Sequence, residues 1–146
     1  SVPAVYAPDV ELELGKAYVI DEGTDVSIIA CGLEVTEARK AAEKLAEEGI
    51  SAEVIDAFSV KPLDTETILA SLAKTGCAVV AEEHSVYGGL CSAVSELCAE
   101  SQPTPLEFVA VRDRFGKSGE FEELMAYFAL DADSIVQAAK KVLTRK

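Results

Sequence analysis

The sequence is poor in the residue types on which many enzyme active sites depend. Its 146 residues include one histidine and no tryptophan, and no apolar run approaches the eighteen or more residues of a membrane-spanning helix. Basic residues are also scarce, and 13 of them against 26 acidic residues give a formal net charge of −13. This charge repels phosphate backbones and anionic lipid, so we expect no nucleic acid and no membrane among the partners.

The four cysteines, Cys31, Cys77, Cys91 and Cys98, are spread too widely for a metal site of the CxxC type. Two of them lie in or beside apolar runs, and Cys91 and Cys98 are spaced to share one face of a helix. A free cysteine in such a position behaves as a small apolar residue. We therefore expect no metal ligands, buried reduced thiols and a cytoplasmic protein.

Short apolar runs alternate with segments of helical periodicity along the chain. The runs predict strands at residues 16–20, 26–30, 52–57, 77–81 and 106–111, and the periodic segments predict helices at 34–48, 65–74, 90–100, 121–128 and from 132 onward. Gly49 and Gly76 are expected to end the first two helices. Asp64 and Asp131 are expected to cap the second helix and the last one.

Strands separated by helices of this length are typical of a parallel sheet with helices on both faces. Residues 21–25 form a turn-rich link with one glycine, so we expect the first two strands to be antiparallel neighbours in a hairpin. The sequence thus predicts an α/β fold, a three-layer α/β/α sandwich whose five-stranded mixed sheet is mostly parallel, with one antiparallel strand from the N-terminal hairpin. Residues 1–14, which include Pro3 and Pro8, are interpreted as a linker from a preceding domain, and residues 15–146 as one domain.

The first candidate functional segment follows the apolar run at 77–81. His84 comes just after it, where open α/β sheets place their ligand sites, and Gly88 and Gly89 open the next helix, where backbone amides could approach an anion. The alternative is a structural or interface histidine and two glycines that allow a tight turn. We favour this alternative, because no GxSxG elbow or other nucleophile arrangement supports His84.

The second candidate segment is a charged loop at residues 112–119. Gly116-Lys117-Ser118 is similar to the end of a phosphate-binding loop, but the glycine required five positions before Gly116 is replaced by Val111. Together with Arg112 and Arg114, Lys117 could bind an anion or contact a neighbouring subunit, and we prefer the contact with a subunit.

Several short motifs occur in a characteristic order. Glu82-Glu83-His84 is followed by Gly88-Gly89-Leu90, by Asp-Arg-Phe-Gly-Lys-Ser-Gly at 113–119 and by the tail from residue 122, and Gly-Lys-Ala at 15–17 precedes them all. This ordered set resembles the C-terminal domain of transketolases over essentially the whole chain, above all the separately encoded C-terminal subunits. One departure is Cys91, which stands where many relatives have a third glycine.

The resemblance implies what the whole enzyme does. A transketolase of the pentose phosphate pathway transfers two-carbon ketol units between sugar phosphates with thiamine diphosphate and magnesium (Mg), and it works as a homodimer. In this family the cofactor and the metal bind between two other domains, whose Gly-Asp-Gly…Asn motif and activating glutamate are missing here. The resemblance therefore implies a domain that is inactive alone, has no catalytic, cofactor-binding or metal residues, and serves subunit assembly, with regulation as a further role.

The expected partners are the remaining transketolase domains or a separate subunit that carries them. Several alternatives stay open. The same domain occurs in 1-deoxyxylulose-5-phosphate synthases and in the decarboxylase subunits of 2-oxo-acid dehydrogenases. The chain could also be a small-anion sensor that uses the segments around His84 and Arg112, or a docking domain for another protein.

Overall fold

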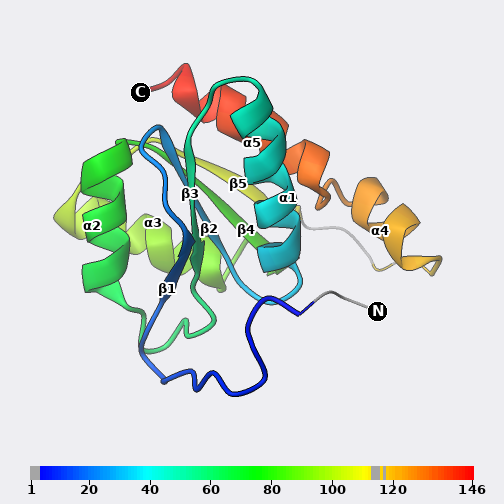
Figure 1. Cartoon of the computed structure of the whole chain (residues 1–146), viewed down its shortest axis with the longest axis horizontal. Helices are drawn as coiled ribbons and strands as arrows, with labels where there is room; N and C mark the ends of the chain where they lie inside the picture. Colours follow the sequence, from blue (N-terminus) through cyan, green and yellow to red (C-terminus); the bar gives the residue numbers. More distant parts are fainter. Residues whose placement is uncertain (1–3, 113–115, 117) are drawn as a thin grey trace.

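The computed structural model describes residues 4–112, 116 and 118–146. In chain order its elements are β1 (Tyr18–Asp21), β2 (Val26–Ala30), α1 (Glu34–Glu47), β3 (Ala52–Asp56), α2 (Thr65–Thr75), β4 (Ala78–Ser85), α3 (Leu90–Ser101), β5 (Leu106–Val111), α4 (Phe121–Tyr127) and α5 (Ala132–Leu143) (Figure 1). Among these residues, no helix is long and apolar enough to cross a bilayer.

The strands form one sheet in the order β1-β3-β2-β4-β5. Strand β2 runs parallel to β3 and β4, β5 runs parallel to β4, and β1 is antiparallel to β3. Helices α1 and α5 cover one face of the sheet, and α2 and α3 cover the other (Figure 1). The predicted three-layer sandwich with a five-stranded, mostly parallel sheet is confirmed.

The pairing of the first two strands differs from the predicted hairpin. Strand β1 pairs with β3, with Val19 opposite Ile55, and β3 therefore lies between β1 and β2. The reason is burial, because β2 is buried along its whole length and takes the central position between two parallel neighbours. Strand β1, whose Val19 is 43% exposed, occupies the edge of the sheet.

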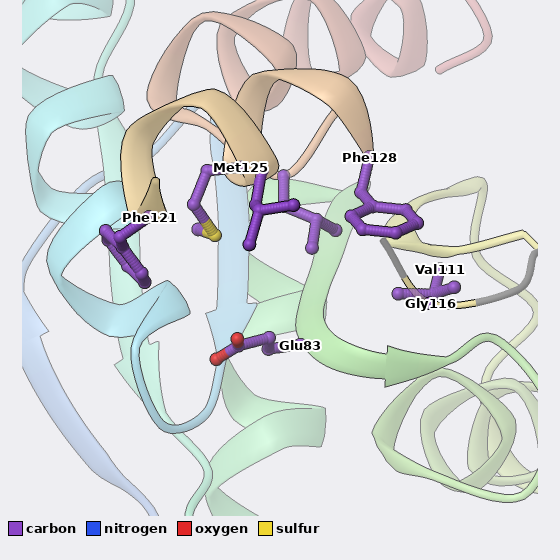
Figure 2. Close-up of a pocket in the computed structure, with 8 residues that line it drawn as sticks. Glu83, Val111, Gly116, Phe121, Met125 and Phe128 are labelled. Carbon is purple, nitrogen blue, oxygen red and sulfur yellow. The ribbon is translucent and has the colours of Figure 1, made fainter. Parts of the chain in front are cut away.

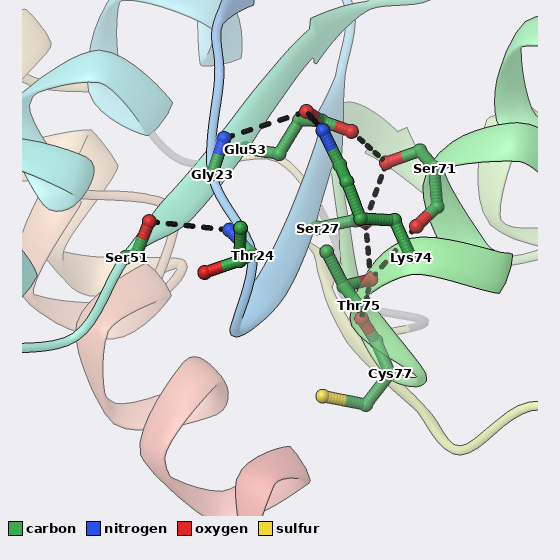
Figure 3. A network of polar contacts seen from close by, with 9 residues as sticks. All are labelled: Gly23, Thr24, Ser27, Ser51, Glu53, Ser71, Lys74, Thr75 and Cys77. Carbon is green, nitrogen blue, oxygen red and sulfur yellow. Dashed lines mark hydrogen bonds and ion pairs between the residues drawn. The ribbon is translucent and has the colours of Figure 1, made fainter.

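The link between β1 and β2 consequently crosses the amino end of β3. Gly23 is required at this crossing, because a Cβ atom there would overlap the backbone of Ala52. Ser51 fixes the link, since its Oγ accepts a hydrogen bond from the amide of Thr24 at 3.1 Å and its carbonyl oxygen accepts one from the amide of Asp25 at 2.8 Å (Figure 3). The turn-rich composition of the link thus serves a crossover between non-adjacent strands.

A buried polar network joins α2 to β2 and β3 (Figure 3). The Oγ atom of Ser27 lies 2.6 Å from Ser71 Oγ and 2.7 Å from Thr75 Oγ1, and Ser71 also donates to Glu53 Oε2 at 2.6 Å. Burial alone would raise the pKa of Glu53, but hydrogen bonds from Lys74 and Ser71 lower it overall. These polar groups satisfy one another, so the network holds α2 against the sheet.

The helix ends follow the predicted signals. Asp64 accepts a hydrogen bond from the amide of Thr67 at 3.2 Å, and Asp131 accepts one from that of Ser134 at 3.1 Å. Gly76 ends α2 in the left-handed region, with φ of 79°. Strand β4 is longer than expected and continues to residue 85 past an irregularity in its pairing with β5.

Candidate functional site

Buried carboxylates gather at the carboxyl ends of the parallel strands. Glu34 follows β2, Asp56 ends β3 and Glu82 lies in β4, and their exposed fractions are 0, 5 and 2%. The Tyr6 hydroxyl donates to Asp56 Oδ2 at 2.8 Å. A buried charge is costly unless it is paired. The contacts of these carboxylates therefore decide whether they are used within the fold or are free to act on a ligand.

The carboxylate of Glu82 occupies the N-terminus of α3. Its Oε1 accepts a hydrogen bond from the amide of Leu90 at 3.0 Å, and its Oε2 accepts one from the amide of Cys91 at 2.5 Å. Gly89 leaves room for this contact, because a Cβ atom there would collide with the carboxylate. A helix N-terminus attracts negative charge, and here the chain supplies it. The two amides that an external anion would use are therefore already bonded within the chain.

His84 lies within β4 rather than after it, and 58% of its side chain is exposed. Its Nδ1 lies 2.8 Å from the carbonyl oxygen of Ser85 and 3.7 Å from Glu82 Oε1. The nearby hydroxyl of Ser92 accepts a hydrogen bond from the amide of Gly88 at 2.8 Å and thereby holds the turn. In the part of the chain that the structure describes, no hydroxyl or thiol is hydrogen-bonded to the imidazole, so a base-activated nucleophile is not formed.

The charged loop is only partly described. The guanidinium of Arg112 folds back on its own strand, where Nη2 donates to the carbonyl oxygen of Phe108 at 3.0 Å and the group lies 5.8 Å from the centre of the phenyl ring. Ser118 is exposed. Arg114 and Lys117 lie outside the described residues.

The two candidate segments lie side by side in the fold. Ser85 pairs with Val111, and the amide of Val86 donates to the carbonyl oxygen of Val111 at 3.0 Å. The turn that contains Gly88 and the start of the charged loop at Arg112 thus leave the sheet from neighbouring strands. Sequence spacing gave no sign of this, because the pairing joins residues about 25 positions apart.

The thiols are poor nucleophiles in this structure. Cys77, Cys91 and Cys98 are buried and Cys31 is half-buried, and all four are free. Burial, followed by the charge of Glu82, raises the pKa of Cys31 to about 11. Burial and Glu82 also raise the pKa of Cys91. Because the thiolate is the reactive form, these residues behave as the apolar side chains that the sequence predicted.

Glu34 is the unusual group that sequence reasoning missed. It is the first residue of α1, it is fully buried, and neither carboxylate oxygen has a hydrogen-bond partner among the described residues. Burial raises its pKa to about 8, and the charges of Glu37, Glu83 and Asp131 add to the shift. An acidic residue in the first turn of a helix is ordinary in a sequence, so only the tertiary structure shows that this one is enclosed.

A cavity of about 280 Å³ opens beside α4 (Figure 2). Apolar side chains of α4 form one wall, and Val111 and Leu130 extend the apolar lining. Glu83 contributes a carboxylate. The cavity is therefore apolar with one acidic end, which suits a side chain or a small apolar molecule better than an anion.

The described residues do not fit thiamine diphosphate or its metal ion. Among them, no group of three or more histidine, cysteine, aspartate and glutamate side chains could hold a metal. The amides of Leu90 and Cys91 are bonded to Glu82, and the carboxylates around Glu34 would repel a diphosphate.

The chain is similar in sequence and fold to known proteins. Residues 15–135 match the family model described as the C-terminal domain of transketolase. The chain is 50% identical over 136 residues to the 6-deoxy-6-sulfo-D-fructose transketolase subunit of a Clostridium species, a match that covers 93% of this chain and 42% of that protein. It is 42% identical over 138 residues to a 1-deoxy-D-xylulose-5-phosphate synthase of Geobacter sulfurreducens, covering 93% of this chain and 22% of the synthase.

A solved structure of a "split gene transketolase, inactive beta4 tetramer" has a TM-score of 0.95 and 45% identity, over 98% of this chain and 47% of that one. The chain spans less than half the length of each of these relatives. The match of the family model over most of the sequence, together with the shared sheet and helices, shows that the chain belongs to the transketolase C-terminal domain family.

Proposed function

We propose that the chain forms the C-terminal part of a transketolase that is divided between two polypeptides, and that it serves assembly rather than chemistry. The observation that carries this proposal is Glu82, whose carboxylate fills the anion-attracting N-terminus of α3. His84, the single histidine of the chain, meanwhile contacts a backbone carbonyl oxygen instead of a nucleophile. A domain whose reactive groups are used for its own folding is suited to supporting a neighbour.

In this proposal the complete enzyme transfers two-carbon ketol units between sugar phosphates. Thiamine diphosphate and magnesium, which supply the carbanion chemistry, bind to the remaining domains, and the assembled enzyme contains two copies of each part. The split-gene relatives support this proposal over a synthase. This chain is 50% identical to the transketolase subunit and covers 42% of it, against 42% identity and 22% coverage for the synthase.

Calorimetry and reconstitution test the proposal together. Titration of the 146-residue chain with thiamine diphosphate and Mg²⁺ is expected to give no binding heat. Addition of the chain to the separately produced remainder of the enzyme, which carries the cofactor domains, is expected to restore ketol transfer from a ketose phosphate to an aldose phosphate. Tight cofactor binding by this chain alone, or reconstitution that fails at every ratio of the two subunits, would overturn it.

The alternative role as an anion sensor has a separate test. Arg112 is bonded to its own strand and the amides of α3 are bonded to Glu82, which argues against a free anion site in the described residues. Titration of the ¹⁵N-labelled chain with inorganic phosphate is therefore expected to give no localised NMR shifts at residues 82–89 and 112. Saturable shifts at these positions would favour the sensor.

A further inference from the structure

Helix α4 leaves part of an apolar face uncovered, because Phe121 is exposed and Leu124 and Phe128 are only half-buried. Phe121, Leu124, Met125 and Phe128 recur at the spacing of one helical face, yet Met125 is the buried residue of α4 and Phe121 is 45% exposed. The helix stands at the side of the sandwich, at the end away from α2 (Figure 1). A helix of seven residues is not stable by itself, so an apolar face of this kind gains stability when something covers it.

The cavity lies directly against this face. In Figure 2, Met125 projects from α4 toward the cavity, and Glu83 lies across the gap from it. Its volume of about 280 Å³ is at the lower limit of pockets for small molecules, which span about 300–1,000 Å³. An inserted side chain from another polypeptide fits such a space.

The open end of the cavity is acidic. Glu83 is exposed, and it acts together with Glu37 and Asp131 on the buried carboxyl group of Glu34. Lys40 pairs with Glu37 at 3.6 Å, but among the described residues no basic side chain pairs with Glu34 or Glu83. Negative charge collected beside an apolar wall attracts a cation.

The charge of Glu83 also acts on Glu34, a buried carboxyl group that is not part of the cavity lining. Buried polar groups in folded proteins are nearly always hydrogen-bonded, and both oxygens of Glu34 lack a partner within the described part of the chain. Among the residues that the structure describes, none donates a hydrogen bond to Glu34.

We propose that this groove, formed by Val111, Leu124, Met125, Phe128, Leu130 and Glu83, docks another polypeptide through an apolar side chain that neighbours an arginine or lysine. The apolar side chain enters the cavity and the cation lies against Glu83. The net charge of −13 favours a basic partner over a second copy of this chain, because two such copies repel each other. The inference rests on the proposed function, in which this chain is one part of a larger enzyme, and it names the surface by which the parts meet.

Short peptides test the chemistry of the groove on the full 146-residue chain. NMR titration with N-acetyl-leucyl-arginine amide is expected to shift the amides of α4 and of Leu130. Replacement of the arginine by glutamate, or of the leucine by glycine, should weaken binding about fivefold, as expected for the loss of one partly exposed ion pair or one apolar contact. Equal responses to all three peptides, or shifts confined to other surfaces, would overturn the proposal.

Matched variants localise the effect. Glu83→Gln is expected to weaken the arginine peptide about fivefold and to leave the glutamate peptide unchanged or slightly stronger. Glu66→Gln, which removes an exposed carboxylate on α2, is the control and should change neither. Leu124→Ala should weaken both leucine peptides. If Leu124→Ala unfolds, the exposed Glu83 still decides the outcome.

The complex with the cofactor-bearing subunit separates this inference from the proposed function. If that subunit is activated by the wild-type chain, and Glu83→Gln and Leu124→Ala bind it as tightly as the wild type, the groove is wrong while the proposed function stands. If it is not activated, the proposed function fails regardless of the peptide results. The remaining outcome is that a second copy of the chain occupies the groove, and sedimentation of the chain alone tests it. If the chain is a dimer and Leu124→Ala dissociates it, a second copy is the occupant and the inference is overturned.

Discussion

Glu34 shows how one residue can link folding to pH. The pKa of its buried carboxyl group is about 8, whereas an unfolded glutamate titrates near about 4.3, so the folded state holds this proton more tightly. The contribution of the protonated Glu34 carboxyl group to the free energy of unfolding is therefore fully present below the unfolded pKa. It is lost as the pH rises through the folded pKa of about 8.

Glu34→Gln is expected to flatten this pH dependence. The amide cannot ionise, so the free energy of unfolding of the variant should exceed that of the wild type by about 1–3 kcal/mol at pH 8 and by little at pH 4.5. Urea unfolding at these two pH values measures the difference, and Glu66→Gln serves as the control for loss of an exposed charge. Parallel pH profiles for Glu34→Gln and the wild type would show that the carboxyl group is not buried as described.

The second prediction for a single side chain concerns the reactivity of the Cys31 thiol. With a pKa of about 11 it should react with iodoacetamide at pH 7.5 about 100-fold more slowly than an unperturbed thiol, because the thiolate fraction falls tenfold for each unit of pKa. Mass spectrometry of the alkylated peptide measures the rate, and the same peptide in denaturant provides the reference. A native rate close to the denatured one would contradict the enclosed site beside Glu82.

Among the elements, the edge strand β1 differs most from expectation. The strand itself, its antiparallel direction and the glycine in the following link were all visible in the sequence. Its partner was not, because a hairpin and a crossover have the same local composition and differ only in which distant strand lies alongside. The deciding contact is Gly23 against Ala52, which are 29 residues apart in the chain.

Gly23→Ala is expected to destabilise the fold by about 1–3 kcal/mol, because the added methyl group must displace the backbone at the start of β3. Gly116→Ala is the matched control, since no atom of the described residues lies within 4 Å of a Cβ placed there. Thermal unfolding of both variants followed by circular dichroism makes the comparison. Equal midpoints would mean that the link does not cross β3 in this way.

Helix α3 shows a related limit of sequence reasoning. The pair Gly88-Gly89 before a helix suggests an anion site, and the structure does contain an anion at that N-terminus. It is the side chain of Glu82, eight and nine residues before the amides that it accepts from. The sequence placed these residues in one segment, but it could not show that the carboxylate turns back onto the helix.

At the scale of the whole molecule, the described residues form one folded domain built on a five-stranded sheet. Its charge is strongly acidic, its described polar groups are mostly paired internally, and its uncovered features lie at the carboxyl edge of the sheet and beside α4. This distribution is the reason that we propose an assembly role. It also explains why the proposed experiments measure complexes rather than turnover by the chain alone.

The sequence by itself determined the order of the elements, the capping residues such as Asp64 and Gly76, the three-layer architecture and the family, because these depend on periodicity, composition and short motifs. Only the tertiary structure decided which strand β1 pairs with, the binding of the Glu82 carboxylate to the N-terminus of α3 and the burial of Glu34. Each of these depends on contacts between residues far apart in the chain. Burial and pairing arise only when those distant segments pack together.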